Sequence, residues 1–195
     1  MSSLKGTETA KNLMTAFAGE SQANMRYTYA AAQAKKDGYV QIQKIFEETA
    51  GNEKEHAKRL YKFLREDFDN GEGIKIDWEY PVVYSTTEEN LEGAIAGEHD
   101  EATSMYPEFA KVAEKEGFKE IARVFTEISE VEEAHETRYQ KLLDNIKAGR
   151  VFERDEEVLW KCLNCGYIHK GKTAPKKCPA CDHPQEFFEL FVENY

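Results

Sequence analysis

Apolar residues recur at steps of three and four positions through four long stretches of the chain. This is the spacing of one buried face of an α-helix. The stretches cover residues 13–34, 42–63, 91–112 and 121–146. Short turns at Asp37-Gly38 and Glu116-Gly117 join the first stretch to the second and the third to the fourth. The pattern therefore predicts two antiparallel helical hairpins.

The connection between the hairpins is long, polar and aromatic. It covers residues 67–84 and contains two glycines and Pro81, so we expect it not to be helical. Residues 85–88, Ser-Thr-Thr-Glu, predict a capping box that opens the third helix. Pro107 is expected to kink that helix or end it early. Four helices with one long crossover predict a mainly α fold of the ferritin-like four-helix type.

The two hairpins resemble each other in sequence. Three segments of the first half match segments of the second: 18–21 with 96–99, 36–39 with 115–118, and 53–56 with 132–135. The offset is 78 residues for the first pair and 79 for the other two, so one residue slips between them. Two copies of this length are not a solenoid, and a duplicated helical hairpin fits better.

Composition narrows the class of protein. The chain has 195 residues, 41% of them apolar and 32% charged, with a formal net charge of −11. This acidity disfavours nucleic-acid binding. No stretch approaches about 18 consecutive apolar residues, so no membrane span is expected. The N-terminus shows no secretory signal. We therefore expect a cytoplasmic, reducing environment.

Charged residues interrupt each apolar stripe at its middle. Glu20 and Glu98 lie in the first and third stripes, and Glu-x-x-His motifs begin at Glu53 and Glu132 in the second and fourth. Glu-x-x-His places both groups on one helix face. A buried carboxylate is costly unless it is paired. Two such motifs plus one Glu from each remaining helix are the ligand set of dinuclear carboxylate sites, typically iron or manganese. A buried Glu–His hydrogen-bond network, or stripes misphased by one residue, would also account for the pattern.

The duplicated halves differ near these positions. Helix three carries Glu101 on the same stripe as Glu98, and we expect it to bind one metal only, with His56 as the alternative ligand. Tyr27 and Tyr106 occupy matching positions at offset 79. Each phenol is expected to hydrogen-bond a ligand carboxylate, although ordinary core tyrosines are about as compatible with the pattern.

All four cysteines lie in the C-terminal part of the chain. Cys162 and Cys165 form one C-x-x-C pair, and Cys178 and Cys181 form another. Such a module predicts a tetrathiolate site for zinc or iron. The cysteines and three of the five prolines lie beyond Gly149, so we expect domains at 1–148 and 149–195.

Taken together, these motifs resemble the rubrerythrin family over nearly the whole chain. The resemblance rests on Leu4-Lys5-Gly6, Phe17-Ala18-Gly19-Glu20-Ser21-Gln22-Ala23, Glu53-Lys54-Glu55-His56-Ala57, Gly97-Glu98, Met105-Tyr106-Pro107, Glu132-Glu133-Ala134-His135 and the module from Trp160 to Pro184. It implies a ferritin-like diiron domain followed by a rubredoxin-like domain with one iron on four cysteines. The implied diiron ligands are Glu20, Glu53, Glu98, Glu101, Glu132 and His135, with His56 as an alternative. Zinc could occupy either site in isolated protein.

The resemblance also implies an activity. It is reduction of hydrogen peroxide to water, with electrons passed through the rubredoxin-like iron from rubredoxin or an NAD(P)H-dependent reductase. Ligand carboxylates, Tyr27 and Tyr106 would relay protons. A head-to-tail homodimer is implied, in which each cysteine site serves the partner's diiron site. The other readings are an iron-oxidising or redox-sensing ferritin-like protein, and a zinc-ribbon binding module.

Overall fold

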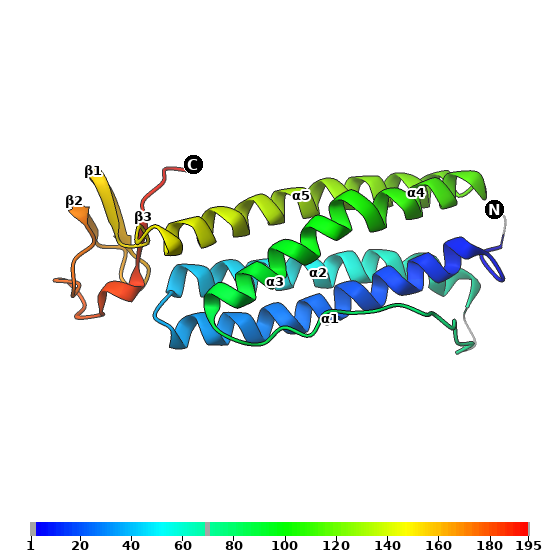
Figure 1. The fold of residues 1–195 in the computed structure, drawn as a ribbon, viewed down its shortest axis with the longest axis horizontal. Coiled ribbons are helices and arrows are strands. Elements are labelled where there is room, and N and C mark those ends of the chain that lie inside the picture. The colour runs from blue at the N-terminus through cyan, green and yellow to red at the C-terminus, as the bar shows by residue number, and fades with distance from the viewer. Residues whose placement is uncertain (1–2, 69–70, 195) are drawn as a thin grey trace.

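The structure, a computed structural model, describes residues 3–68 and 71–194 (Figure 1). The helical part consists of α1 (Glu8–Lys36), α2 (Val40–Asp67), α3 (Thr87–Asp100), the π-helical segment η1 (Glu101–Met105), α4 (Tyr106–Lys115) and α5 (Lys119–Lys147). The C-terminal part consists of β1 (Glu153–Cys162), β2 (Ile168–Thr173), the 3₁₀ turn η2 (Gln185–Phe187) and β3 (Phe188–Leu190). The ferritin-like four-helix bundle expected from the sequence is confirmed, and the small C-terminal unit lies at one end of it.

The third helix of the bundle is divided into three pieces. Regular α-helix ends at Asp100, five residues follow in π geometry, and α4 begins at Tyr106 with Pro107 in its first turn. A proline fits there because the first amide groups of a helix have no partner within the helix. The π segment lies where the repeat offset changes from 78 to 79, between Glu98 and Tyr106. The extra residue is thus absorbed as a π bulge, which often marks a functional site.

The predicted capping box at residues 85–88 is displaced by one position. The N-cap of α3 is Thr86, which accepts a hydrogen bond from the amide of Glu89, and the Glu89 carboxylate accepts one from the Thr86 amide in return. Ser85 lies outside the helix, and its amide donates to the side chain of Asn90 at 2.9 Å. The sequence Thr-Thr-Glu-Glu offers two equivalent registers, and this contact with Asn90 is made in the observed one.

The two hairpins cap each other's helices. Asp37, just after α1, accepts hydrogen bonds from the amide and hydroxyl of Thr87 at 3.0 and 2.6 Å. Glu116, just after α4, accepts the corresponding bonds from Thr9 at 2.8 and 2.5 Å. Each first helix therefore begins on a carboxylate supplied by the other half, which satisfies free amide groups and complements the helix dipole.

Two apolar clusters fill the bundle. One contains Leu13, Leu60, Phe109 and Phe125, and the other contains Ile42, Phe46, Leu91 and Leu142. A third cluster surrounds Trp160, which is fully buried in the C-terminal sheet of strand order β2-β1-β3. Phe152 stacks on Tyr39 at the end of the bundle, with ring centroids 6.5 Å apart.

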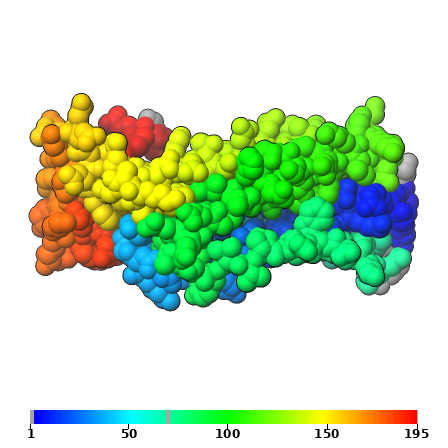
Figure 2. Space-filling view, in the orientation of Figure 1, coloured from blue at the N-terminus to red at the C-terminus, as the bar shows by residue number. Residues whose placement is uncertain are grey.

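The crossover between α2 and α3 contains no helix in its described residues and lies along the outside of the bundle (Figures 1 and 2). Trp78 packs edge-on against Phe109, and the Tyr80 hydroxyl donates to the carbonyl of Thr15 at 2.9 Å. The side chain of Val83 lies against the backbone of Gly93, where an added Cβ would stand 2.9 Å away. Side chains from the crossover thus anchor it to three different helices.

Candidate metal centres

Six of the predicted ligands meet in the middle of the bundle. Their ligand atoms form two overlapping groups, within each of which all atoms lie within 4.8 Å of one another. The first group contains Glu20, Glu53, His56 and Glu132, and the second contains Glu53, Glu98, Glu132 and His135. Glu53 and Glu132, the first residues of the two Glu-x-x-His motifs, belong to both groups and therefore lie where bridging ligands would.

The two groups are nearly symmetric. The Nδ1 atom of His56 lies 3.0 Å from Glu132, 3.1 Å from Glu53 and 3.6 Å from Glu20. The Nδ1 atom of His135 lies 2.8 Å from Glu132, 3.3 Å from Glu53 and 3.6 Å from Glu98. Each imidazole thus faces one carboxylate of its own and both shared carboxylates, as the duplicated sequence predicts.

Several polar atoms of this cluster have no good hydrogen bond. Within the described residues these are both carboxylate oxygens of Glu132, one each of Glu53 and Glu98, and Nδ1 of His135. Their residues are all at most 5% exposed. Buried polar atoms are otherwise almost always paired. Oxygen and nitrogen atoms that converge without partners fit two bound metal ions.

The electrostatics also favour cations. Burial, with the negative charge of Glu53 and Glu132 added, raises the pKa of Glu20 well above its usual value despite a hydrogen bond with His56. Burial likewise raises the pKa of Glu98 to about 8, against the opposing effect of His135. Without a compensating positive charge, these carboxyls would be protonated near neutral pH. A metal pair would keep them ionised.

Glu101 stands apart from both groups. It begins the π segment, is partly exposed, and its Oε1 atom approaches the backbone of Gly19, where the Tyr80 ring also lies. Burial and the nearby carboxylates, Glu20 first, raise the pKa of Glu101 well above its usual value. The structure therefore places Glu101 at the edge of the cluster, whereas His56 lies in the first group.

The two predicted tyrosines reach the cluster crosswise. Tyr27 on α1 donates to Oε1 of Glu98 on α3 at 2.5 Å. Tyr106 on α4 donates to Oε1 of Glu20 on α1. Both rings are at most 2% exposed. Each phenol therefore fixes a carboxylate that comes from the other half of the duplication.

The four cysteines form a second cluster. Sγ of Cys162 lies 3.8 Å from Sγ of Cys181, and Sγ of Cys165 lies 3.6 Å from Sγ of Cys178. A tetrahedral metal with sulfur at about 2.3 Å requires edges of about 3.8 Å. Each C-x-x-C pair is followed by a residue with positive φ, Gly166 or Asp182, whose amide donates back to the carbonyl of the first cysteine. The sulfur geometry fits a four-coordinate ion.

The sequence did not single out three residues near the dinuclear cluster. Tyr139 is fully buried one turn after His135, and Thr49 is fully buried on α2. Arg138 donates to Thr49 Oγ1 at 2.6 Å and to Glu48 at 2.7 Å. Tyr139 was recognised only as part of the apolar stripe; the mismatch with Leu60, its counterpart at offset 79, could have identified it.

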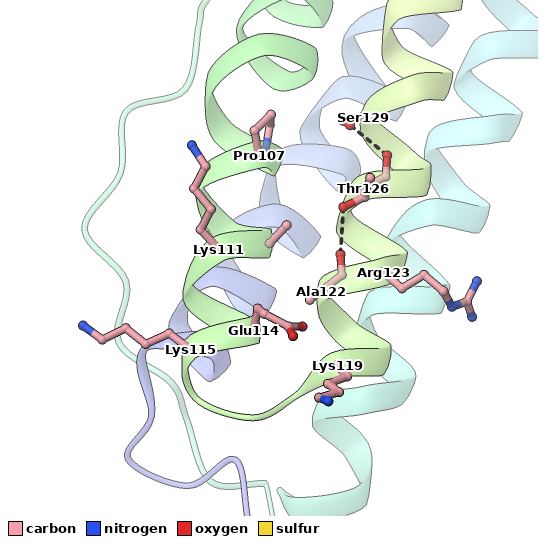
Figure 3. A pocket seen from close by; sticks show the side chains of 10 residues that line it. Pro107, Lys111, Glu114, Lys115, Lys119, Ala122, Arg123, Thr126 and Ser129 are labelled. Atoms are coloured by element: carbon pink, nitrogen blue, oxygen red, sulfur yellow. Dashed lines mark hydrogen bonds between the residues drawn. The ribbon is translucent and has the colours of Figure 1, made fainter.

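A surface groove of about 750 Å³ lies between α4 and α5, away from the cluster (Figure 3). Lys111 and Lys115 extend outward from one side, Arg123 extends from the other, and Glu114 points toward α5. The groove contains none of the predicted ligands. Its open form and mixed charge do not indicate a metal centre.

A helical bundle with a dinuclear carboxylate–histidine cluster, joined to a tetrathiolate unit, defines a non-haem iron redox protein. Comparison with known proteins agrees. The Rubrerythrin family model matches residues 11–143, and the model for the rubrerythrin rubredoxin-like domain matches residues 160–189. The chain belongs to the rubrerythrin family, with the family's diiron centre and four-cysteine iron centre.

Individual relatives extend over the full length. A rubrerythrin of Clostridium perfringens is 58% identical, and one of Nitratidesulfovibrio vulgaris is 53% identical, each over 100% of both chains. The structure of nigerythrin in a partially reduced state superposes with a TM-score of 0.63 at 33% identity and covers 97% of this chain and 92% of that one. Among the described residues, no helix has the length and apolar character needed to cross a membrane.

Proposed function

We propose that this chain is a peroxidase that reduces hydrogen peroxide to two molecules of water and thereby serves in oxidative-stress defence. One observation carries the proposal: the bundle holds a cluster suited to two metal ions, and the same chain carries a second, four-sulfur centre. Membership of the rubrerythrin family supports an oxidoreductase role. An iron-storage protein would explain the bundle but would have no evident use for the cysteine centre.

The proposed diiron ligands are those predicted from the sequence. Glu20, Glu98 and His135 would each serve one metal, and Glu53 and Glu132 would bridge. Glu101 and His56 would be alternative ligands on the Glu20 side, consistent with the outlying position of Glu101. The iron pair would supply both electrons and bind the peroxide oxygens.

The protein side chains would organise this chemistry. Tyr27 and Tyr106 hold Glu98 and Glu20 by donated hydrogen bonds and so orient the ligand oxygens. We propose that these phenols and the ligand carboxylates also relay the two protons that peroxide reduction consumes. The apolar clusters on either side restrict water around the site.

The cysteine centre would return electrons one at a time. Cys162, Cys165, Cys178 and Cys181 would hold one iron, which receives electrons from rubredoxin or an NAD(P)H-dependent reductase. We propose residues 1–148 and 149–195 as the two domains, a cytoplasmic location, and a head-to-tail homodimer. In one chain the cysteine unit lies beyond one end of the bundle (Figure 1). A partner's cysteine centre could therefore be the better electron donor.

Nigerythrin structures carry the descriptions partially reduced and mixed-valent. Those descriptions concern nigerythrin. We propose by analogy that the diiron pair of this chain also passes through a state with one reducing electron.

The test is anaerobic mixing of fully reduced, iron-loaded protein with one equivalent of peroxide, followed by visible absorption. We expect the colour of the ferric cysteine centre to appear as peroxide is consumed by two electrons at a time. Glu53→Gln should abolish consumption, whereas the matched control Glu55→Gln, exposed on the same helix, should not. Peroxide consumption by Glu53→Gln at the wild-type rate would refute the site assignment.

A further inference from the structure

Tyr139 is a buried phenol that the proposed reaction does not use. It lies on α5 one turn after His135, is fully buried, and its hydroxyl has no hydrogen-bond partner of good geometry in residues 3–68 and 71–194. Buried hydroxyls without partners are uncommon and call for an explanation. An apolar side chain would meet the needs of the core without this cost.

The ring of Tyr139 is in direct contact with the dinuclear cluster's own tyrosine. Its centroid lies 5.5 Å from that of Tyr27, edge to face, and 5.0 Å from that of Phe46. The Tyr27 hydroxyl in turn donates to the proposed ligand Glu98 at 2.5 Å. Two phenols in van der Waals contact therefore lead away from the cluster.

The duplication provides an internal comparison. At offset 79, Tyr106 corresponds to Tyr27, and Phe125 corresponds to Phe46. Tyr106 also packs on its phenylalanine, with centroids 5.8 Å apart, but Leu60 stands at the position of Tyr139. Leu60 is fully buried in its own apolar cluster. The fold is therefore satisfied by leucine at this position, and only one half of the bundle carries the second phenol.

Polar groups on the same side lead from Tyr139 to the surface. Its hydroxyl faces that of Thr49, which accepts a hydrogen bond from Arg138 at 2.6 Å. Arg138 also binds the exposed carboxylate of Glu48. The counterpart of Thr49 at offset 79 is Ile128. A route for a proton therefore accompanies the second phenol and is absent at the matching position.

We propose that Tyr139 is a one-electron donor to the dinuclear centre through Tyr27, used when peroxide meets a centre that holds only one reducing electron. This inference rests on the proposed peroxidase function. Reduction of hydrogen peroxide to two waters takes two electrons and two protons. One electron comes from the remaining ferrous ion and one from Tyr139, which becomes a neutral tyrosyl radical. Its phenolic proton passes to Thr49 and is released to solvent beside Glu48, while the two protons consumed come from solvent. Tyr139 thus prevents one-electron cleavage of peroxide to hydroxyl radical.

The test uses iron-loaded protein reduced to one electron per dinuclear centre, mixed with one equivalent of peroxide and rapidly frozen for electron paramagnetic resonance. We expect an organic-radical signal that narrows when tyrosine is ring-deuterated. Tyr139→Phe retains the ring and should lose the signal. The matched control Tyr61→Phe removes an exposed phenol from α2 and should keep it. Zinc-loaded protein should give no signal.

The outcomes separate this inference from the proposed function. Fully reduced Tyr139→Phe should consume peroxide like the wild type, because both electrons then come from iron. An undiminished radical in Tyr139→Phe, or no radical in one-electron-reduced wild type that consumes peroxide, would overturn the role of Tyr139. If fully reduced wild type does not consume peroxide, the peroxidase proposal fails, and this inference fails with it.

Discussion

The hydrogen bond from Tyr27 to Glu98 gives a test of whether Glu98 binds metal. Tyr27→Phe removes only the buried hydroxyl and leaves the contacts of the ring with Phe46 and Tyr139 in place. Burial raises the pKa of Glu98 to about 8 in the metal-free protein, so near neutral pH the bond joins two neutral groups. A neutral bond contributes about 1 kcal/mol, whereas one to an ionised carboxylate contributes about 1.5–3 kcal/mol.

The expected loss therefore depends on metal. Tyr27→Phe should lower the free energy of unfolding by about 1 kcal/mol without metal and by about 2 kcal/mol with it, because the metal would keep Glu98 ionised. For a chain of this size, about 2 kcal/mol corresponds to a fall in Tm of about 4–8 °C. Denaturant unfolding followed by helical circular dichroism, with and without metal, measures both values.

Tyr61→Phe is the matched control, since that ring is 48% exposed, and it should change neither value. Tyr106→Phe should repeat the pattern through Glu20. An equal loss for Tyr27→Phe with and without metal would mean that Glu98 does not change ionisation on loading, and would refute its place among the ligands.

Three further predictions concern the fold and the second centre. Burial opposes ionisation of Asp37, but hydrogen bonds from Thr87 lower its pKa; Asp37→Asn should therefore cost about 1 kcal/mol near neutral pH. This cost should vanish as pH falls below about 4, and urea titrations at both pH values would show whether it does. Gly93→Ala would place a Cβ 2.9 Å from a crossover side chain and should destabilise the chain by about 1–3 kcal/mol. Gly51→Ala, with open space around it, should stabilise it by up to about 1 kcal/mol; thermal unfolding of the pair would contradict this if both changed alike. Cys165→Ser should remove the colour of the cysteine centre without altering helical circular dichroism, and persistence of that colour would argue against this ligand.

The helices and the metal clusters could be read from the sequence because their signals are local or repeated. Four apolar stripes with Glu20, Glu98 and two Glu-x-x-His motifs at their centres have one geometric solution: the charged layers meet. The cysteine pairs are equally explicit. The predicted contacts of Tyr27 and Tyr106 with ligand carboxylates also follow from the duplication and are confirmed.

Other features depend on contacts that leave no local pattern. The caps supplied by Asp37 and Glu116 join residues 50 and 107 positions apart. The placement of Tyr80 over Gly19 requires knowing the path of a crossover without periodicity. The one-residue error at the capping box arose because Ser85 and Thr86 are equally good N-cap residues, and the choice is made by the contact with Asn90.

The π segment at residues 101–105 determines which changes of length this protein can tolerate. Each residue added to an α-helix turns everything after it by about 100°, which would rotate a buried face into water. Here the added residue is stored in the wider turn, so that Glu98 before it and Tyr106 after it both still face the metals. The first half of the molecule manages without such a residue, since α1 is continuous from Glu8 to Lys36. Removing one residue from this segment should leave regular α-helix and keep the bundle in register, whereas a single deletion within the buried part of any other helix would break its packing.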